Sequence, residues 1–301
     1  MENKKEINLV LSGGSARGLA HIGILSVLEK HFHIKSIIGT SMGAIVGGLY
    51  AYGYTPEEML EIPESFNIVK LISIFKPKFK TSGVIDGKGV LEFLEKKTRD
   101  CNIEHCKIPF AAVSFDLNSK RSIIIDKGSL AKALRASSSL PFIFQPFKYG
   151  KYLLVDGFIE HPLPIKFANY FYDEGLTIAC SVLPPAPAKY EVFEFEEIKD
   201  EEEIPKMLDI FFQTNFYSQS ATVLDAVFKS KPDIYISAYD EELDFWDLKE
   251  AEKFFEVGKN AAEKVISKYM SDSEHFSQNN FMKKLHDNYE DFRKMVRKLS
   301  Q

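Results

Sequence analysis

Two tight, glycine-rich turns near the start of the chain limit what this sequence can fold into. The first turn, Ser12–Gly18, follows the apolar run Glu6–Leu11 and precedes apolar residues at helical spacing. The second, Gly39–Gly43, follows the short run Ser36–Ile38 and leads into Met42–Tyr52, a segment rich in small residues. Two successive strand–turn–helix units are typical of a parallel sheet covered by helices. We therefore expect an α/β fold with a mainly parallel central sheet and helices on both faces.

Later segments extend this pattern over one domain that comprises residues 1–301, with its core at 7–166. Further strands are predicted at 110–115, 122–126, 152–156, 176–183 and 233–238. Prolines and a run of acidic residues predict an exposed acidic connection over 184–205, because like charges packed together repel. The remaining segment, 206–301, is predicted to be a mainly helical extension with the strand near 233–238, and includes an apolar helical stripe over 248–269.

Composition excludes several classes of protein. A net charge of −5 argues against nucleic-acid binding, which needs a concentrated basic surface. Cys101, His105 and Cys106 lie close together, but no second cluster with zinc-ligand spacing follows, so neither a metal nor another cofactor is expected. No apolar run reaches the roughly 18 residues of a membrane-spanning helix. The sequence predicts a cytoplasmic protein, leaves peripheral membrane contact open, and does not indicate an oligomeric state.

The second turn carries a candidate nucleophile. Gly39-Thr40-Ser41-Met42-Gly43 has the pattern G-x-S-x-G between a strand and a helix. In this context the sharp turn lifts a serine hydroxyl clear of the sheet, and small flanking residues allow the chain to reverse. We therefore interpret Ser41 as a nucleophile and Gly39 and Gly43 as parts of its elbow. The alternative is an ordinary helix-capping turn.

The first turn carries a candidate oxyanion hole. Consecutive glycines after a strand let backbone N–H groups converge on an anion, and a following helix N-terminus adds a positive dipole. The loop matches neither the Walker A nor the dinucleotide-binding pattern. We expect the N–H groups of Gly13, Gly14 and Ser15 to face a developing alkoxide, with Arg17 holding the loop or adding positive charge.

The sequence leaves two alternatives for the general base. Of seven histidines, only His161 lies near a suitable acid, five residues after Asp156. Asp156 itself ends the predicted strand 152–156 and precedes Gly157, so its carboxylate would emerge beside a tight turn at a strand terminus. A Ser41–Asp156 pair and a triad that includes His161 both remain open at this point.

Taken together, these motifs resemble the patatin-like phospholipase family. The family's glycine loop G-G-x-x-R-G is matched by Gly13, Gly14, Arg17 and Gly18, and its elbow by residues 39–43. Its aspartate–glycine pair is matched by Asp156 and Gly157, and residues 135–146 resemble the stretch that precedes this pair. The resemblance extends over about residues 7–166. It implies a serine acyl hydrolase with a Ser41–Asp156 dyad, no histidine base and no metal.

Three departures from the family pattern concern the width of the site and the efficiency of the base. Ser15 replaces a third loop glycine, Phe158 replaces a small residue, and His161-Pro162 replaces a downstream asparagine pair. The resemblance implies lipid acyl esters as substrates, of the phospholipase A or lysophospholipase type. A lipid-binding or regulatory protein without activity, and a peptidase or thioesterase on the same scaffold, are the rival hypotheses.

Three segments are candidates for contact with lipid. Residues 68–80 interleave apolar and lysine side chains, which suits either a lipid interface or a lid over the site. Phe142, Phe144 and Phe147 are candidate walls for an acyl chain, although core packing explains them equally well. The amphipathic last helix is a further candidate for membrane contact.

Overall fold

The computed structural model describes residues 4–65, 85–185, 207–243 and 248–271. The predictions for 68–80 and for the last helix lie outside the described residues, as does most of the predicted connection 184–205.

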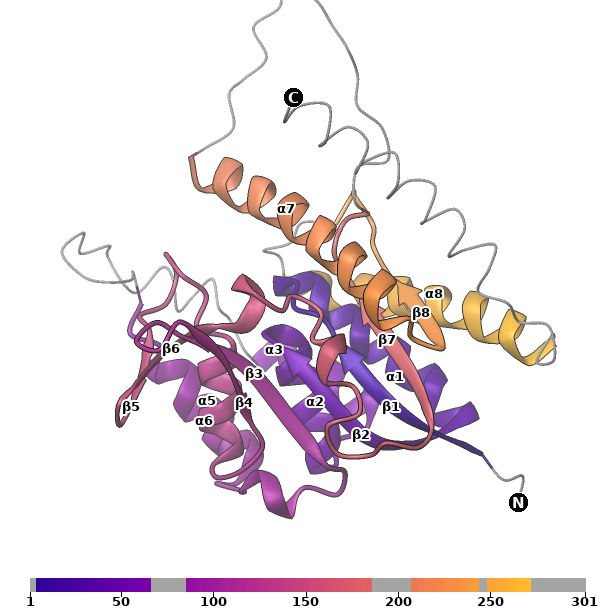
Figure 1. Cartoon of the computed structure of the whole chain (residues 1–301), viewed down its shortest axis with the longest axis horizontal. Helices are drawn as coiled ribbons and strands as arrows, with labels where there is room; N and C mark the ends of the chain where they lie inside the picture. Colours follow the sequence, from indigo (N-terminus) through magenta and orange to yellow (C-terminus); the bar gives the residue numbers. More distant parts are fainter. Residues whose placement is uncertain (1–3, 66–84, 186–206, 244–247, 272–301) are drawn as a thin grey trace, which may run out of the picture.

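One sheet of eight strands forms the centre of the molecule (Figure 1). Its order is β5-β6-β3-β2-β1-β7-β8, and β4 also pairs with β3. The strands are β1 (Lys5–Leu11), β2 (Phe32–Thr40), β3 (Phe110–Asp116), β4 (Arg121–Ile125), β5 (Phe147–Tyr149), β6 (Tyr152–Asp156), β7 (Leu176–Ser181) and β8 (Ile234–Ser237). The pairs β1–β2, β2–β3, β1–β7 and β7–β8 are parallel, whereas β3–β4, β3–β6 and β5–β6 are antiparallel.

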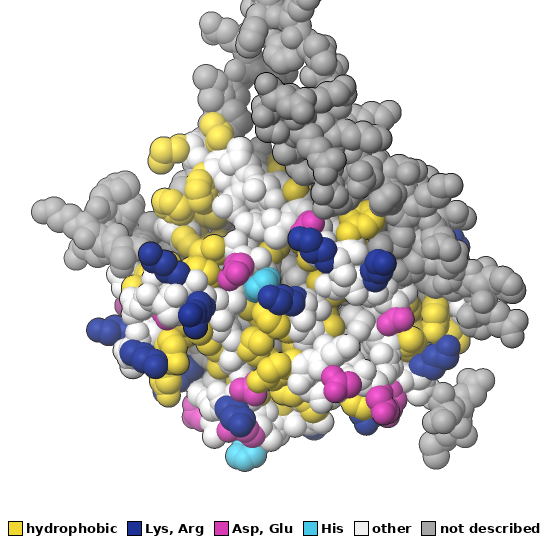
Figure 2. Space-filling view, in the orientation of Figure 1, with side chains coloured by type: hydrophobic (Ala, Val, Ile, Leu, Met, Phe, Trp, Pro, Cys, Tyr) yellow, Lys and Arg dark blue, Asp and Glu magenta, His cyan; other side chains and the backbone are white. Residues whose placement is uncertain are grey.

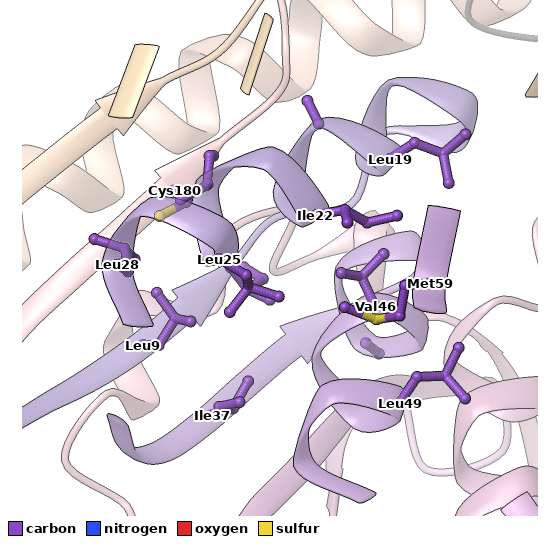
Figure 3. Close-up of a cluster of buried hydrophobic side chains, with 14 of the residues drawn as sticks. Leu9, Leu19, Ile22, Leu25, Leu28, Ile37, Val46, Leu49, Met59 and Cys180 are labelled. Carbon is purple, nitrogen blue, oxygen red and sulfur yellow. The ribbon is translucent and has the colours of Figure 1, made fainter. Parts of the chain in front are cut away.

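Helices pack on one face of this sheet. They are α1 (Ala20–His31), α2 (Met42–Tyr52), α3 (Pro56–Ser65), α5 (Lys88–Thr98), α6 (Leu130–Ser137) and α8 (Ala251–Ser271). Figure 3 shows Leu9 and Ile37 reaching from β1 and β2 toward Leu25 of α1, and all three are buried. Alternate strand residues point to this face, as expected for the two-residue period of a strand.

The opposite face is covered by α7 (Met207–Ser230) and by the segment after β6. Val10 of β1 and Ala179 of β7 share a buried cluster with Phe212 and Phe216 of α7 and with Phe158. Among the described residues, no helix is long and apolar enough to cross a membrane.

The predicted α/β fold is confirmed, although some strands differ from the prediction. The predicted strand at 36–38 is longer and runs from Phe32 to Thr40, because Phe32 and Ile34 are also buried against the core. The three-residue strand β5 was not predicted, because Phe147–Tyr149 is short and two of its residues are exposed. The predicted helix 42–52 coincides with α2.

Candidate active site

Ser41 lies on the sharp turn that joins β2 to α2. Its backbone has φ 56° and ψ −124°, a strained conformation for a residue with a side chain. Residues 39 and 43 must be glycine because neighbouring backbone atoms lie where a Cβ would be. A Cβ at Gly39 would lie 2.5 Å from the carbonyl oxygen of Gly43, and a Cβ at Gly43 would lie 2.3 Å from that of Ser12. The elbow is thus pressed against the end of β1, where the glycine-rich loop begins.

The sheet register brings Asp156 to this serine. Thr40 of β2 pairs with Val113 of β3, and the next residue of β3, Ser114, pairs with Asp156 of β6. Strand β4 pairs with the same two residues of β3 and so occupies its other edge, which leaves β2 and β6 end to end along one edge. Ser41, the residue after Thr40, therefore lies next to Asp156, the last residue of β6. The Ser41 hydroxyl donates a hydrogen bond of 2.6 Å to Oδ2 of Asp156. The sequence predicts a mainly parallel sheet, but β6 is antiparallel to both of its neighbours, β3 and β5.

The environment of Asp156 suits a general base. Its side chain is fully buried, and this burial raises the pKa of Asp156 to about 7. The hydrogen bonds from Ser41 and from the N–H of Phe158 lower the pKa but do not cancel the effect of burial. A carboxylate with a pKa near neutrality is a far better proton acceptor than one in water.

The last residue of α6 and the segment that follows it hydrogen-bond to the backbone of both Ser41 and Asp156. The N–H of Ser41 donates to Oγ of Ser137, and the Ser137 hydroxyl donates to the carbonyl oxygen of Val113. The N–H of Asp156 donates to the carbonyl oxygen of Ser139. Reasoning from the sequence gave these serines no such role, and the signal for it was the run of three serines at 137–139.

The glycine-rich loop lies against the nucleophile, but its amides differ in availability. A Cβ at Gly13 would lie 2.7 Å from the Phe158 ring and 3.1 Å from Cβ of Ser41. The N–H of Gly13 donates to the carbonyl oxygen of Pro162 at 2.9 Å, so it is already engaged. The N–H groups of Gly14 and Ser15 have no acceptor among the described residues. Ser15 also lines the same cavity as Ser41.

A buried histidine supports the same loop from α1. His21 is fully buried, and its Nε2 lies 2.9 Å from the carbonyl oxygen of Ser12. Burial lowers the pKa of His21 to about 4, so the ring is neutral and donates to this carbonyl. The Ser12 hydroxyl accepts from the N–H of Val182, which ties the loop to the end of β7.

The Arg17 side chain contacts neither Ser41 nor Asp156, here called the reacting pair, in any interaction that the described residues show. Its guanidinium carbon lies 4.9 Å from the ring centre of Tyr239 and 5.7 Å from that of Phe216. It lines a surface pocket together with Glu241 and Glu242, and this pocket includes neither Ser41 nor Asp156. Of the two roles expected for Arg17, these contacts fit that of holding the loop.

The structure does not bring His161 to the nucleophile. Its ring packs edge-on against Phe167, 5.0 Å between centres, and its Nε2 lies 4.0 Å from a carboxylate oxygen of Glu160. Its link to the elbow is through the backbone, because the Thr40 hydroxyl donates to the His161 carbonyl oxygen. The hydrogen bond of Ser41 goes to Asp156 instead.

Ser41 opens onto an apolar cavity of about 130 Å³, here called the aliphatic cavity. Its walls come from α1, α2, α3, α5 and the segment after α6, and include Ile22, Val46, Met59 and Leu94. Phe144 lines this cavity as expected, whereas Phe142 is 55% exposed and does not. Among the described residues, no group of three or more His, Cys, Asp or Glu side chains could hold a metal ion.

Comparison with known protein families shows to which family the chain belongs. The family model for patatin-like phospholipase matches residues 9–169, just over half of the 301 residues. The matched region includes the glycine-rich loop, Ser41 and Asp156. The chain belongs to the patatin-like phospholipase family. The resemblance stated from the motifs is thereby confirmed.

Known members of this patatin-like family extend well beyond the aligned region. An uncharacterized NTE family protein of Mycobacterium tuberculosis is 34% identical over 160 residues, which cover 53% of this chain and 44% of the relative. Lysophospholipase NTE1 of Scheffersomyces stipitis is 26% identical over 282 residues, which cover 89% of this chain and 18% of the relative. The chain thus spans less than half the length of these relatives. The crystal structure of VipD from Legionella pneumophila aligns with 88% of this chain and 67% of its own, with 11% identity and a TM-score of 0.44.

Proposed function

We propose that this protein hydrolyses carboxylic esters of lipids, with Ser41 as the nucleophile and Asp156 as the only general base. The observation that carries the proposal is the 2.6 Å hydrogen bond from the Ser41 hydroxyl to a fully buried carboxylate, at the opening of an apolar cavity. The family to which the chain belongs supports this reaction class. A relative that is named a lysophospholipase supports lipid esters as the substrate.

In the acylation half of the reaction, Asp156 accepts the Ser41 proton while Oγ forms a bond to the ester carbonyl carbon. Asp156 then returns this proton to the departing alcohol as the ester bond breaks, which leaves an acyl-enzyme. In the second half, Asp156 takes a proton from water as the water oxygen forms a bond to the acyl carbon. It then returns this proton to Oγ of Ser41 as the acyl–oxygen bond breaks, which releases the fatty acid. The carboxylate ends each cycle ionised, so one group serves both halves.

The negative charge that develops on the carbonyl oxygen needs hydrogen-bond donors. We assign this role to the N–H groups of Gly14 and Ser15, because the N–H of Gly13 is engaged with Pro162. The N–H of Met42 is a third candidate, since it follows the nucleophile at the N-terminus of α2, where the helix dipole favours negative charge. One such donor is typically worth about 3 kcal/mol of activation free energy.

The aliphatic cavity suits the acyl chain of the substrate. Ser41 is part of its wall, so a chain attached to the reacting carbonyl would extend directly into it. Aliphatic side chains stabilise a hydrocarbon chain by removing it from water, at about 0.8 kcal/mol for each methylene group.

The test is hydrolysis of a panel of lipid esters, with the released fatty acids measured by mass spectrometry. We expect Ser41→Ala and Asp156→Asn each to lower turnover by a factor of about 10² to 10⁴, because each removes a group that takes part in proton transfer or bond formation. Thermal unfolding of both variants should stay cooperative. Turnover close to that of the unaltered protein in Asp156→Asn would exclude the dyad.

A fluorophosphonate probe separates an enzyme from a binding protein that has lost its activity. The probe reacts with an activated serine, so Ser41 should be labelled and the Ser41→Ala variant should not. An unlabelled protein would favour the binding protein, whereas labelling without release of fatty acid would favour a peptidase or thioesterase.

A further inference from the structure

A second apolar pocket begins at the other side of the reacting pair. It has a volume of about 50 Å³ and is lined by Asp156, Phe158, Phe212, Asn215 and Phe216, and we call it the aromatic pocket. The aliphatic cavity is lined by Ser41 but not by Asp156, whereas the aromatic pocket is lined by Asp156 but not by Ser41. The reacting pair therefore lies between two separate apolar spaces.

One side chain, Leu140, forms part of the wall of both spaces. The two pockets are therefore adjacent, and the Ser41 hydroxyl that lines one lies 2.6 Å from the Asp156 carboxylate that lines the other. A single hydrocarbon chain on a reacting carbonyl needs only one of them. Two chains that join within a few bonds of the reacting ester need two apolar paths that start close together, as these do.

Contacting aromatic rings form part of the wall of the aromatic pocket. The Phe158 ring meets that of Phe216 edge-on at 5.6 Å between centres, and Phe211 meets Phe212 in the same way at 5.3 Å. The carboxylate of Asp156 accepts from the N–H of Phe158, so the base and the pocket wall are one continuous structure. Edge-on pairs of this kind are favourable beyond the area that they bury.

The chemistry of the wall excludes a charged ligand group. Among the described residues that line the aromatic pocket, only Asp156 and Asn215 have polar side chains. A phosphate would face the carboxylate and lose its hydration with little in return, and burying an unpaired charge is costly. A hydrocarbon chain carries no charge, so its burial in this pocket costs neither charge hydration nor repulsion from the carboxylate.

Exposed apolar side chains continue the aromatic pocket to the surface. Ile159 lines the pocket and is 43% exposed, and the exposed ring of Phe142 packs against Phe211 at 4.5 Å between centres. Met207 and Ile210, in the first turn of α7, are also exposed. Figure 2 shows hydrophobic side chains gathered beside the N-terminal half of α7, at the upper left of this face. A pocket of this volume holds a few carbon atoms, and the rest of a chain would lie along this surface.

We infer that the aromatic pocket binds the second hydrocarbon chain of a two-chain ester lipid, while the aliphatic cavity binds the chain that is cleaved. The inference rests on the proposed function and adds a substrate class to it, namely diacyl lipids in preference to lipids with one chain.

The experiment compares palmitate release from dipalmitoyl phosphatidylcholine and from palmitoyl lysophosphatidylcholine in the same detergent micelles. Asn215→Trp fills the aromatic pocket from the half-buried side of α7, and Ile159→Trp narrows it at its exposed end. Thr214→Trp is the matched control, because Thr214 is exposed on the same helix and does not line the pocket. The readout is the ratio of kcat/KM for the two-chain lipid to kcat/KM for the one-chain lipid. Partial unfolding cancels in this ratio.

We expect the ratio to fall at least tenfold in Asn215→Trp, to fall in Ile159→Trp, and to stay within twofold in Thr214→Trp. A ratio that is unchanged in both pocket variants, or an unaltered protein that cleaves only the one-chain lipid, would overturn the inference.

Cleavage of p-nitrophenyl butyrate distinguishes the failure of this inference from the failure of the proposed function. If this soluble ester is cleaved in a Ser41-dependent manner while the lipid ratio does not respond, the inference fails and the proposed function stands. If no ester is cleaved, both fail.

Discussion

At the scale of single residues, Ser41 is held by two hydrogen bonds. Its hydroxyl donates to the carboxylate of Asp156, and its backbone N–H donates to Oγ of Ser137. Because Asp156 is fully buried, its protonation state depends strongly on pH near neutrality. The sequence allowed Ser41 and Asp156 to be predicted from their motifs. The engagement of the Gly13 N–H by Pro162 depends on a segment more than 140 residues away and could not be predicted.

The pH dependence of hydrolysis should follow the ionisation of Asp156. The base must be ionised to accept the Ser41 proton, and its pKa is raised to about 7. We expect kcat/KM to be constant above about pH 8 and to fall about tenfold per pH unit below pH 7. A pH–rate profile with a soluble ester measures this. A midpoint near pH 4, the ordinary range of an aspartate, would contradict the role of burial.

The same raised pKa predicts an effect on stability. Above its ordinary pKa of about 3.9, Asp156 is ionised in the unfolded chain but protonated in the folded protein until the pH reaches about 7. The folded state therefore holds the extra proton, and the contribution of this group to the free energy of unfolding falls as the pH rises through this window. Asp156→Asn removes this dependence. Chemical denaturation should show that the variant gains stability relative to the unaltered protein between pH 5 and pH 8, and no relative gain would contradict the burial of the charge.

At the scale of elements, α1 and α8 pack so closely that side chains are excluded at the crossing. A Cβ at Gly258 of α8 would lie 1.8 Å from the carbonyl oxygen of Ala20, and one at Gly23 of α1 would lie 2.0 Å from that of Phe255. The apolar stripe over 248–269 predicted a helix here, and the structure has α8 at Ala251–Ser271. The packing of α8 against α1 could not be predicted, because the spacing of apolar residues shows which face of a helix is buried but not which element covers that face. The short loops 117–120 and 150–151 make β3–β4 and β5–β6 antiparallel, because a parallel pair needs a long crossover connection. The antiparallel pairing of β6 with β3, in contrast, joins distant segments and could not be predicted from local sequence.

Gly258→Ala should therefore destabilise the protein from a position remote from Ser41. Forcing a methyl group into this contact should lower the free energy of unfolding by about 2 kcal/mol or more, since the neighbouring atoms are backbone and cannot rotate away. Asn260→Ala is the control, because Asn260 is exposed on the same helix and alanine favours helices. Equal stability of the two variants in a denaturant titration would show that the helices are not packed this closely.

At the scale of the whole molecule, the region matched by the family model is not a complete sheet. It ends at residue 169, whereas β7 and β8 follow it and β7 pairs with the central strand β1. The N–H of Ser12 donates to the carbonyl oxygen of Cys180, so the glycine-rich loop is also held by this later part. We propose that the chain folds as one domain. The sequence predicted the later strands, but not that α7 would form a wall beside Asp156.

A chain that ends at residue 170 should consequently fail to fold cooperatively. It would lack β7, β8, α7 and α8. The edge of β1 that pairs with β7 would be exposed, as would the buried apolar residues that α8 covers on one face of the sheet and α7 on the other. Circular dichroism during thermal unfolding is the measurement. A sharp transition like that of the whole chain would contradict the single domain and favour an independent unit over residues 7–166.

The claim on which the rest depends is that Asp156 activates Ser41 without a histidine. The most direct measurement is the rate constant for fluorophosphonate labelling of Ser41, located by peptide mass spectrometry, in the unaltered protein, Asp156→Asn and His161→Ala. We predict at least a hundredfold lower rate constant in Asp156→Asn and a value within threefold of the unaltered protein in His161→Ala. Rapid labelling of Asp156→Asn together with loss of labelling in His161→Ala would contradict the account.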